Sequence, residues 1–367
     1  ELALSMDYVS DWSIVDAIRE LYQNCIDEKE QSGHDWFSTY ENGVLTIGNH
    51  KSKLNIASLL IGYTSKRGDS KTIGRHGEGY KVASVVLLRN GLTFKIKNYA
   101  AKEVWEAHVV KKVVKFEVSN LGIFNKSLED SISFEIGGVT EEVYKEVVNS
   151  NLWLQGIDSS SDKVLSCADG MVLLDPKYSG HVYVGGLYVK SFHKSSVKYG
   201  YNFNPGNIVL DRDRHMLDTW DVKFAASSLV AKLPVEDIEK VMDSPECEYI
   251  LNYIKGDNSD GKLSYLSESE FNTFISRYGE NCVPVADSDT FNRYASAGYS
   301  CQMLSPRDYK LVTSSSRYVK KDLQESSWVD LVSRLETLVN SIMVSESKKL
   351  ALNELVKEMK EKAKKEK

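Results

Sequence analysis

Apolar residues recur at intervals of three and four along residues 13–30, the first strongly patterned part of the chain. The residues that share this face are Ile14, Ile18, Leu21 and Cys25, with Val15, Tyr22 and Ile26 beside them. This spacing matches the period of an α-helix with one buried face. The pattern therefore predicts an amphipathic helix over residues 13–30.

Shorter patterned runs follow this helix. The sequence Glu41-Asn42-Gly43 is typical of a turn, and it precedes a short strand expected over residues 44–47. A helix is predicted over residues 54–60. Another follows Gly77 and ends at Asn90-Gly91, because that pair is a strong turn signal.

Four runs rich in β-branched and aromatic residues then favour an antiparallel sheet, and a helix is expected after them over residues 140–149. These runs cover residues 92–99, 103–110, 113–118 and 131–136. Helices that precede a group of strands indicate an α+β domain. We predict a two-layer sandwich with helices on one face of a mixed sheet.

The second half of the chain is patterned less regularly. It contains a predicted strand over residues 181–190 and a helical stretch that begins at Pro234. The polar stretch 256–261 is a candidate boundary. Beyond it, a small β-α-β unit is expected, and leucines at helical spacing from Ser327 onward lead into a lysine-rich tail. The tail is interpreted as a solvated helix end in preference to a nucleic-acid-binding arm.

Composition narrows the class of protein. The 367 residues are 42% hydrophobic, enough for a folded protein of two or three domains, and the net charge of −6 does not favour nucleic acid as the partner. The five cysteines are widely spaced and predict neither a disulfide framework nor a zinc site. The sequence has no apolar stretch long enough to span a bilayer. We expect a cytoplasmic protein that does not enter the membrane.

Three polar residues of the first helix, Glu20, Asn24 and Asp27, stand at positions i, i+4 and i+7 and share one face. A carboxylate such as Glu20 can deprotonate an attacking water, and the amide oxygen of Asn24 can ligate magnesium. Asp27 could lie near the sugar or base of a nucleotide, or it could brace the helix. Taken alone, this triplet is more often a solvent-facing polar stripe.

A glycine-rich segment, Gly74-Arg75-His76-Gly77-Glu78-Gly79-Tyr80-Lys81, precedes the later helix. Glycines allow the backbone amides to turn toward an anion such as a phosphate. The segment lacks the G-K-[ST] ending of a Walker loop, and no strand leads directly into it as in a Rossmann fingerprint.

Together, these two elements resemble the GHKL superfamily, which includes gyrase B subunits, MutL proteins, heat-shock chaperones and histidine kinases. The resemblance covers roughly residues 10–150 and implies a Bergerat-type pocket that closes a lid over ATP and magnesium. It implies that Glu20 is the general base, that Asn24 is the magnesium ligand and that the lid spans residues 62–79. The residues assigned to nucleotide binding are Asn24, Asp27, Asn49, Lys66, Gly74, His76, Gly77, Glu78, Gly79 and Lys81.

The chain departs from the family after the strand at residues 44–47. GHKL proteins usually carry D-x-G-x-G there, and this sequence reads Asn49-His50-Lys51-Ser52-Lys53. Asn49 is the counterpart of the aspartate that receives the adenine amino group. A neutral amide oxygen can still accept that hydrogen bond, at a cost of about 1 kcal/mol. Lys51 and Lys53 stand where the family has glycines.

The resemblance, together with the pattern of the second half, divides the chain into three expected parts. Residues 1–150 are assigned to the ATP-binding domain, 151–232 to a transducer-like continuation, and 233–367 to a C-terminal α/β and helical module. In related hydrolases, a lysine from the following domain reaches the terminal phosphate. Lys190, Arg212 and Arg214 are the candidates here, although Arg212 and Arg214 could equally form ion pairs with neighbouring aspartates.

The leading functional hypothesis is a slow, magnesium-dependent ATPase whose lid closure changes contacts with a protein partner or a second copy. A kinase is less favoured, because no preceding helix carries a phosphoacceptor histidine. One alternative is a module that binds nucleotide or protein without hydrolysis. Another is a DNA-associated ATPase, which would depend on the basic tail and on Lys95, Lys97, Lys111, Lys112 and Lys115. The layout also resembles GHKL proteins encoded by bacteriophages.

Overall fold

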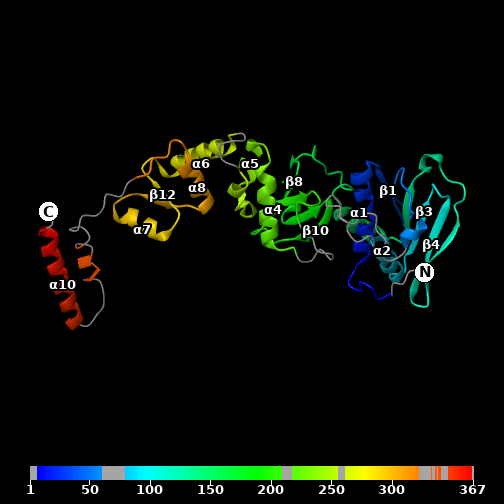
Figure 1. Cartoon of the computed structure of the whole chain (residues 1–367), viewed down its shortest axis with the longest axis horizontal. Helices are drawn as coiled ribbons and strands as arrows, with labels where there is room; N and C mark the ends of the chain where they lie inside the picture. Colours follow the sequence, from blue (N-terminus) through cyan, green and yellow to red (C-terminus); the bar gives the residue numbers. More distant parts are fainter. Residues whose placement is uncertain are drawn as a thin grey trace. The chain divides into compact units, whose positions relative to one another are not determined.

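A computed structural model describes residues 6–59, 79–208, 217–254 and 261–321, and beyond these residues 332, 335, 336, 338, 339 and 346–365. The chain divides into two compact units between Lys255 and Gly256. The polar stretch 256–261, which the sequence marks as a candidate boundary, lies at this division. Figure 1 shows the elements of both units.

Helix α1 (Ile14–Ser32) confirms the first predicted helix. Ser13 begins it with a capping box, in which its side chain accepts from the backbone of Asp16 while the Asp16 carboxylate accepts from the backbone of Ser13. Gly33 ends the helix in the left-handed conformation, and its N–H donates to the carbonyl of Lys29. Both ends of α1 are thus determined by local sequence.

The first sheet has six strands in the order β1-β2-β6-β3-β4-β5, and every adjacent pair is antiparallel. The strands are β1 (Trp36–Glu41), β2 (Val44–Asn49), β3 (Thr93–Asn98), β4 (Glu103–Val110), β5 (Val113–Asn120) and β6 (Ile132–Gly137). The predicted strand over 44–47 and the four predicted runs are confirmed. Strand β1 was not predicted, because its residues are only partly buried and do not alternate clearly.

Helices α1, α2 (Gly79–Arg89) and α3 (Glu141–Asn149) form the second layer. Their apolar sides share one core with the inward residues of the sheet, including Phe94, Ile96 and Trp105. This arrangement confirms the two-layer α+β prediction (Figure 1). The predicted helix over 54–60 is wrong for the residues that the structure describes, because only a 3-10 turn forms over Ile56–Leu59.

The opposite face of the first sheet is polar. Lys95 lies 3.4 Å from the carboxylate of Glu106, and Lys97 pairs with Glu135. Two of the five lysines on which a DNA-binding role would depend are therefore already paired with carboxylates of neighbouring strands.

The second sheet of this unit has five strands in the order β10-β9-β11-β8-β7, in which β9 and β11 are parallel and the other pairs antiparallel. The strands are β7 (Val164–Cys167), β8 (Gly170–Leu173), β9 (His181–Val184), β10 (Leu187–Ser191) and β11 (Gly200–Phe203). The single strand predicted over 181–190 is wrong, because Gly185 and Gly186 turn the chain into the β9–β10 hairpin. Gly186 has a φ of 82°, and a Cβ there would lie 2.1 Å from the Trp153 indole nitrogen.

Helices α4 (Thr219–Ala231) and α5 (Val235–Val241) follow this sheet, and the stretch predicted from Pro234 is indeed helical. Next to them, the carboxylate of Glu246 is fully buried and accepts three hydrogen bonds. The donors are the backbone amides of Lys198 and Tyr199, at 2.9 and 3.0 Å, and the hydroxyl of Tyr201 at 3.0 Å. Burial and the neighbouring Cys247 and Glu246 raise the pKa of Tyr201, so its hydroxyl keeps the proton that it donates.

We expect Glu246→Ala to lower the free energy of unfolding by on the order of 3 kcal/mol, because the buried hydroxyl of Tyr201 and two part-buried backbone amides lose their charged acceptor. Urea denaturation would measure the change. Glu248→Ala is the matched control: its carboxylate is 53% exposed and pairs with Lys223 at 2.7 Å, so the expected cost is below about 1 kcal/mol. Equal effects of the two substitutions would contradict this role for Glu246.

The second unit contains the predicted β-α-β motif. Strands β12 (Val283–Val285) and β13 (Cys301–Met303) are parallel and are joined by α7 (Ser288–Ser296). The other described helices of this unit are α6 (Lys262–Tyr278), α8 (Pro306–Ser314) and α10 (Glu346–Lys365). None of the helices in the described part of the chain has both the length and the apolar character required to cross a bilayer.

Candidate functional site

The polar row on α1 is not a solvated stripe. Glu20 is only 9% exposed, Asp27 has no exposed surface, and Asn24 is partly buried. Helix α2 packs against α1 and covers this side of it. Burial of a polar group without a hydrogen bond lowers the stability of the fold. Exposure to solvent therefore does not explain why these polar residues are on this face.

Gly79, the first described residue of α2, lies against this row. A Cβ at position 79 would be 3.1 Å from Asn24 Nδ2 and 3.1 Å from Glu20 Oε2. The structure thus brings together three predicted residues, Glu20, Asn24 and Gly79, from two helices. The absence of a side chain at Gly79 is what allows the carboxylate and the amide to approach the backbone of α2.

The side-chain amide of Asn24 differs from most buried polar groups in its hydrogen bonding. Its Nδ2 atom is buried and has no hydrogen-bond partner in the part of the chain that the structure describes. An orphaned buried amide is rare in folded proteins and is found where a ligand or a functional constraint holds it. Asn151 Nδ2 has the same property among the described residues, so this property alone does not identify a ligand site.

The packing of α1 against α2 is reinforced by Arg89, at the end of α2. Its guanidinium donates to four backbone carbonyls of the segment just before α1. They belong to Met6, Tyr8, Val9 and Trp12, at 3.1 to 3.3 Å. Arg89 thus anchors the segment that precedes α1 to the end of α2. This contact helps to maintain the position of Glu20 and Asn24 relative to Gly79.

Lys81 and Asp27 both lack exposed surface. The ammonium of Lys81 lies 5.9 Å from the centre of the Tyr80 ring. Complete burial of Asp27 fits the bracing role that the sequence left open. Burial of both charges places them in the core around the site rather than at its surface.

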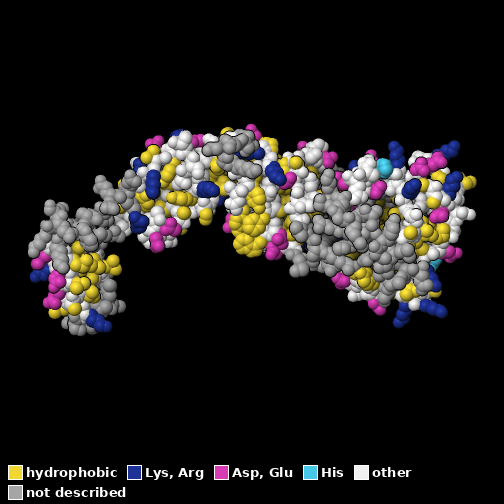
Figure 2. All heavy atoms as spheres, viewed as in Figure 1, with side chains coloured by type: hydrophobic (Ala, Val, Ile, Leu, Met, Phe, Trp, Pro, Cys, Tyr) yellow, Lys and Arg dark blue, Asp and Glu magenta, His cyan; other side chains and the backbone are white. Residues whose placement is uncertain are grey.

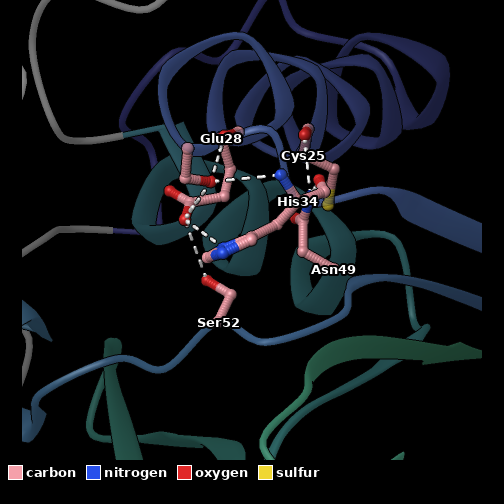
Figure 3. Close-up of polar contacts among 6 residues, drawn as sticks. Cys25, Glu28, His34, Asn49 and Ser52 are labelled. Carbon is pink, nitrogen blue, oxygen red and sulfur yellow. Dashed lines mark hydrogen bonds and ion pairs between the residues drawn. The ribbon is translucent and has the colours of Figure 1, made fainter.

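Asn49 ends β2 on the same side of the sheet. Its Nδ2 donates to the carbonyl of Cys25 at 2.9 Å and, more weakly, to that of His34 at 3.4 Å (Figure 3). Because carbonyl oxygens only accept, these contacts orient the amide with Nδ2 toward α1 and Oδ1 away from it. Asn49 therefore offers an acceptor on its other side.

Three residues beside Asn49 were not among the predicted candidates. Glu28 accepts a hydrogen bond from Ser52 at 3.3 Å, and its carboxylate lies 3.8 Å from His34 Nδ1 (Figure 3). Glu28 continues the row of Glu20 and Asn24 at i+8, which is the signal that could have identified it. His34 and Ser52 have no such signal, because only the fold brings them next to α1.

Lys51 retains the backbone conformation that glycine would favour. Its φ is 53°, in the left-handed region, whereas Lys53 does not have a positive φ. A glycine would adopt this conformation without a steric penalty, whereas Lys51 adopts it at a cost in strain.

We expect Lys51→Val to destabilise the protein by about 1–2 kcal/mol, because a β-branched residue is strongly disfavoured in the left-handed region. Lys51→Gly should change stability by less than about 1 kcal/mol, since relief of strain offsets the greater freedom of the unfolded chain. Thermal unfolding measures both. Lys53→Val is the matched control and should have little effect, and a loss as large as that of Lys51→Val would contradict the argument.

Several predicted residues lie outside the described part of the chain. They are Lys66, Gly74, His76, Gly77, Glu78, Arg212 and Arg214. The expected lid over residues 62–79 lies outside it too, except for Gly79. Lys190 is described, and its ammonium donates to the carbonyl of Leu217 at 2.8 Å.

Comparison with known proteins gives structural likenesses only. The chain matches the ATPase and transducer domains of DNA topoisomerase II from Balamuthia mandrillaris with 10% identity and a TM-score of 0.33, over 48% of this chain and 60% of that one. The chain thus spans less than two thirds of that protein. It also matches the ATPase region of Saccharomyces cerevisiae topoisomerase II, with 11% identity over 66% of this chain and 86% of that region. The TM-score is 0.39 for the form bound to ICRF-187 and 0.36 for another structure of the region.

No protein-family profile and no curated protein matches the chain. With TM-scores below 0.5, the structural likenesses do not by themselves assign an activity.

Proposed function

We propose that this chain binds ATP with magnesium between α1 and the glycine-rich segment that leads into α2, in the manner of GHKL proteins. ATP is then hydrolysed slowly, and closure of the lid changes association with a protein partner or a second copy in the cytoplasm. The observation that carries the proposal is the approach of Glu20 and Asn24 to Gly79.

The described residues fit such a ligand. Magnesium prefers oxygen ligands, and water molecules and substrate phosphates usually supply most of them. The single amide oxygen of Asn24 would therefore suffice on the protein side. Magnesium would neutralise charge on the phosphates. Glu20, held beside Asn24, is positioned to accept a proton from an attacking water. Backbone amides at the start of α2 would face the phosphates.

Asn49 would determine which nucleobase the site prefers. With Nδ2 held by two carbonyls, Oδ1 can accept from the amino group of adenine. Guanine carries a carbonyl oxygen at the equivalent position, which would meet an acceptor. We therefore propose that ATP binds in preference to GTP.

Isothermal titration calorimetry with magnesium tests the binding step. Wild type should bind ATP, Asn24→Ala should bind at least about tenfold more weakly, and the difference should disappear when EDTA replaces magnesium. Glu30→Ala, an exposed position on the same helix, serves as the control and should bind like wild type. Absence of ATP binding by wild type would refute the assignment of the site.

The alternative of a module that binds nucleotide without hydrolysis is less favoured. A carboxylate that is buried beside a magnesium ligand is unfavourable for binding a polyphosphate, because like charges repel. The presence of Glu20 at this position is explained if its carboxylate accepts a proton from the attacking water. Association with DNA is also less favoured, because Lys95 and Lys97 are paired with Glu106 and Glu135.

A further inference from the structure

Strand β5 is an edge strand of the first sheet and lacks several features that commonly prevent edge pairing. It stands last in the strand order, it is eight residues long, and its pairing with β4 runs without a register shift. It contains no proline. A long edge strand without a bulge or a proline can pair with a further strand.

The β4–β5 hairpin shows which backbone groups of β5 face outward. Its turn residues, Lys111 and Lys112, have φ values of 50° and 64°, as in a two-residue turn whose flanking residues form a hydrogen-bonded pair. Hydrogen-bonded pairs alternate along an antiparallel ladder, so the N–H and C=O groups of Val114, Phe116 and Val118 point away from β4. In the described part of the chain, these groups form no backbone hydrogen bond with another segment.

A row of charged side chains crosses the polar face of the first sheet and ends at β5 with two adjacent carboxylates. Lys95 stands between Glu135 and Glu106 in this row. Glu117 lies directly opposite Glu106 and is 80% exposed. His108 Nε2 lies 3.9 Å from its carboxylate, and this contact is an ion pair only when the imidazole is protonated. Since like charges opposite each other destabilise a sheet, a cation on the outer side of Glu117 would be favourable.

A second copy of β5 supplies that cation in one register. When β5 pairs antiparallel with itself, residues with outward backbone groups must face each other, so the two-fold axis passes through a residue position. With the axis at Phe116, Lys115 faces Glu117 of the other copy, and Glu117 faces Lys115 of the other copy. With the axis at Lys115 or at Glu117, identical charges face each other. Charge complementarity therefore selects the axis at Phe116.

The apolar face of β5 is compatible with the same register. Phe116 is partly buried against the first core, with its ring centroid 6.4 Å from that of Phe94, and Val118 is 42% exposed. With the axis at Phe116, the two Phe116 side chains are neighbours, and each Val118 faces Val114 of the other copy. Figure 2 shows hydrophobic side chains at the surface where Figure 1 labels β4, whose Val109 is 47% exposed. Pairing would thus cover apolar surface at this edge.

We propose that β5 pairs with β5 of a second copy about a two-fold axis at Phe116, which joins the two first sheets into one continuous sheet. The pairing requires no nucleotide and goes beyond the proposed ATPase function. A single edge strand buries less than the roughly 1,200 Å² of a stable complex, so we expect a dissociation constant on the order of 10–100 μM.

Sedimentation velocity of the full chain without nucleotide, at concentrations of about 5–200 μM, tests this proposal. Wild type should exchange between monomer and dimer. Lys115→Glu and Glu117→Lys each place like charges across the axis, and each should weaken dimerisation by about tenfold or more. An equimolar mixture of the two variants should associate again, because every facing pair then has opposite charges. Lys115→Glu/Glu117→Lys should also dimerise like wild type.

Two control variants and a check of folding complete the experiment. Lys145→Glu reverses a charge on α3, where the side chain is 72% exposed, and should leave dimerisation unchanged. Asn24→Ala should also dimerise like wild type, which separates this inference from the proposed ATP site. Circular dichroism should show that all variants are folded.

Three results would overturn the proposal. In the first, wild type stays monomeric over this range, so that the β5 edge is either unpaired or reserved for a strand of another protein. In the second, Lys115→Glu and Glu117→Lys dimerise as tightly as wild type. In the third, the two folded variants do not associate when they are mixed.

Discussion

Glu20→Gln is expected to reduce ATP turnover by about 10²- to 10⁴-fold while magnesium-dependent ATP binding persists. The amide preserves the size of the side chain and its approach to Gly79, but it cannot accept a proton from water. Phosphate release under single-turnover conditions measures the effect, since it separates the chemical step from product release.

Glu30→Gln is the matched control for this experiment. It makes the same chemical change on the same helix at an exposed position, and turnover should equal that of wild type. If Glu20→Gln hydrolyses ATP at the normal rate, Glu20 is not the base. If wild type binds ATP without hydrolysis, the site is a nucleotide-binding module.

The second large effect is expected at Gly79, where stability and binding should change in opposite directions. Gly79→Ala replaces the poorest non-proline helix former with the best, which should add up to about 1 kcal/mol of stability. The new methyl group would lie 3.1 Å from both Asn24 Nδ2 and Glu20 Oε2, so these side chains must shift. We expect magnesium-ATP affinity to fall by about ten- to a hundredfold.

Thermal unfolding and calorimetry on the same sample measure the two effects. Gly122→Ala is the control, because a Cβ there meets no atom within 4 Å. It should leave ATP affinity unchanged. Unchanged affinity in Gly79→Ala would show that the close approach of Glu20 and Asn24 to α2 has no role in binding.

Much of the first unit could be predicted from local sequence. The capping box of Ser13 and Asp16 and the left-handed Gly33 determine the limits of α1. Strands β3 to β6 have enough β-branched and aromatic residues to be recognised individually. These features depend on neighbours within a few residues, which is the range that a sequence pattern describes.

The predictions from sequence were incomplete or wrong where contacts between residues distant in the chain determine the structure. Strand β1 is an edge strand with half-buried residues, so only its pairing with β2 identifies it. The β9–β10 hairpin turns at Gly185 and Gly186 because Trp153, more than thirty residues away, packs against the bare glycine backbone. Neither feature has a periodic signal in the chain.

The sequence by itself determined the residue types of the candidate site and their spacing on α1. Only the tertiary structure decided that this polar row is buried against Gly79, and that Asn49 faces Cys25 and His34. The physical reason is that helical periodicity specifies which residues share a face, whereas the environment of that face depends on which element packs on it. A solvated stripe and a buried polar row have the same local pattern, and the packing of α2 on α1 distinguishes them.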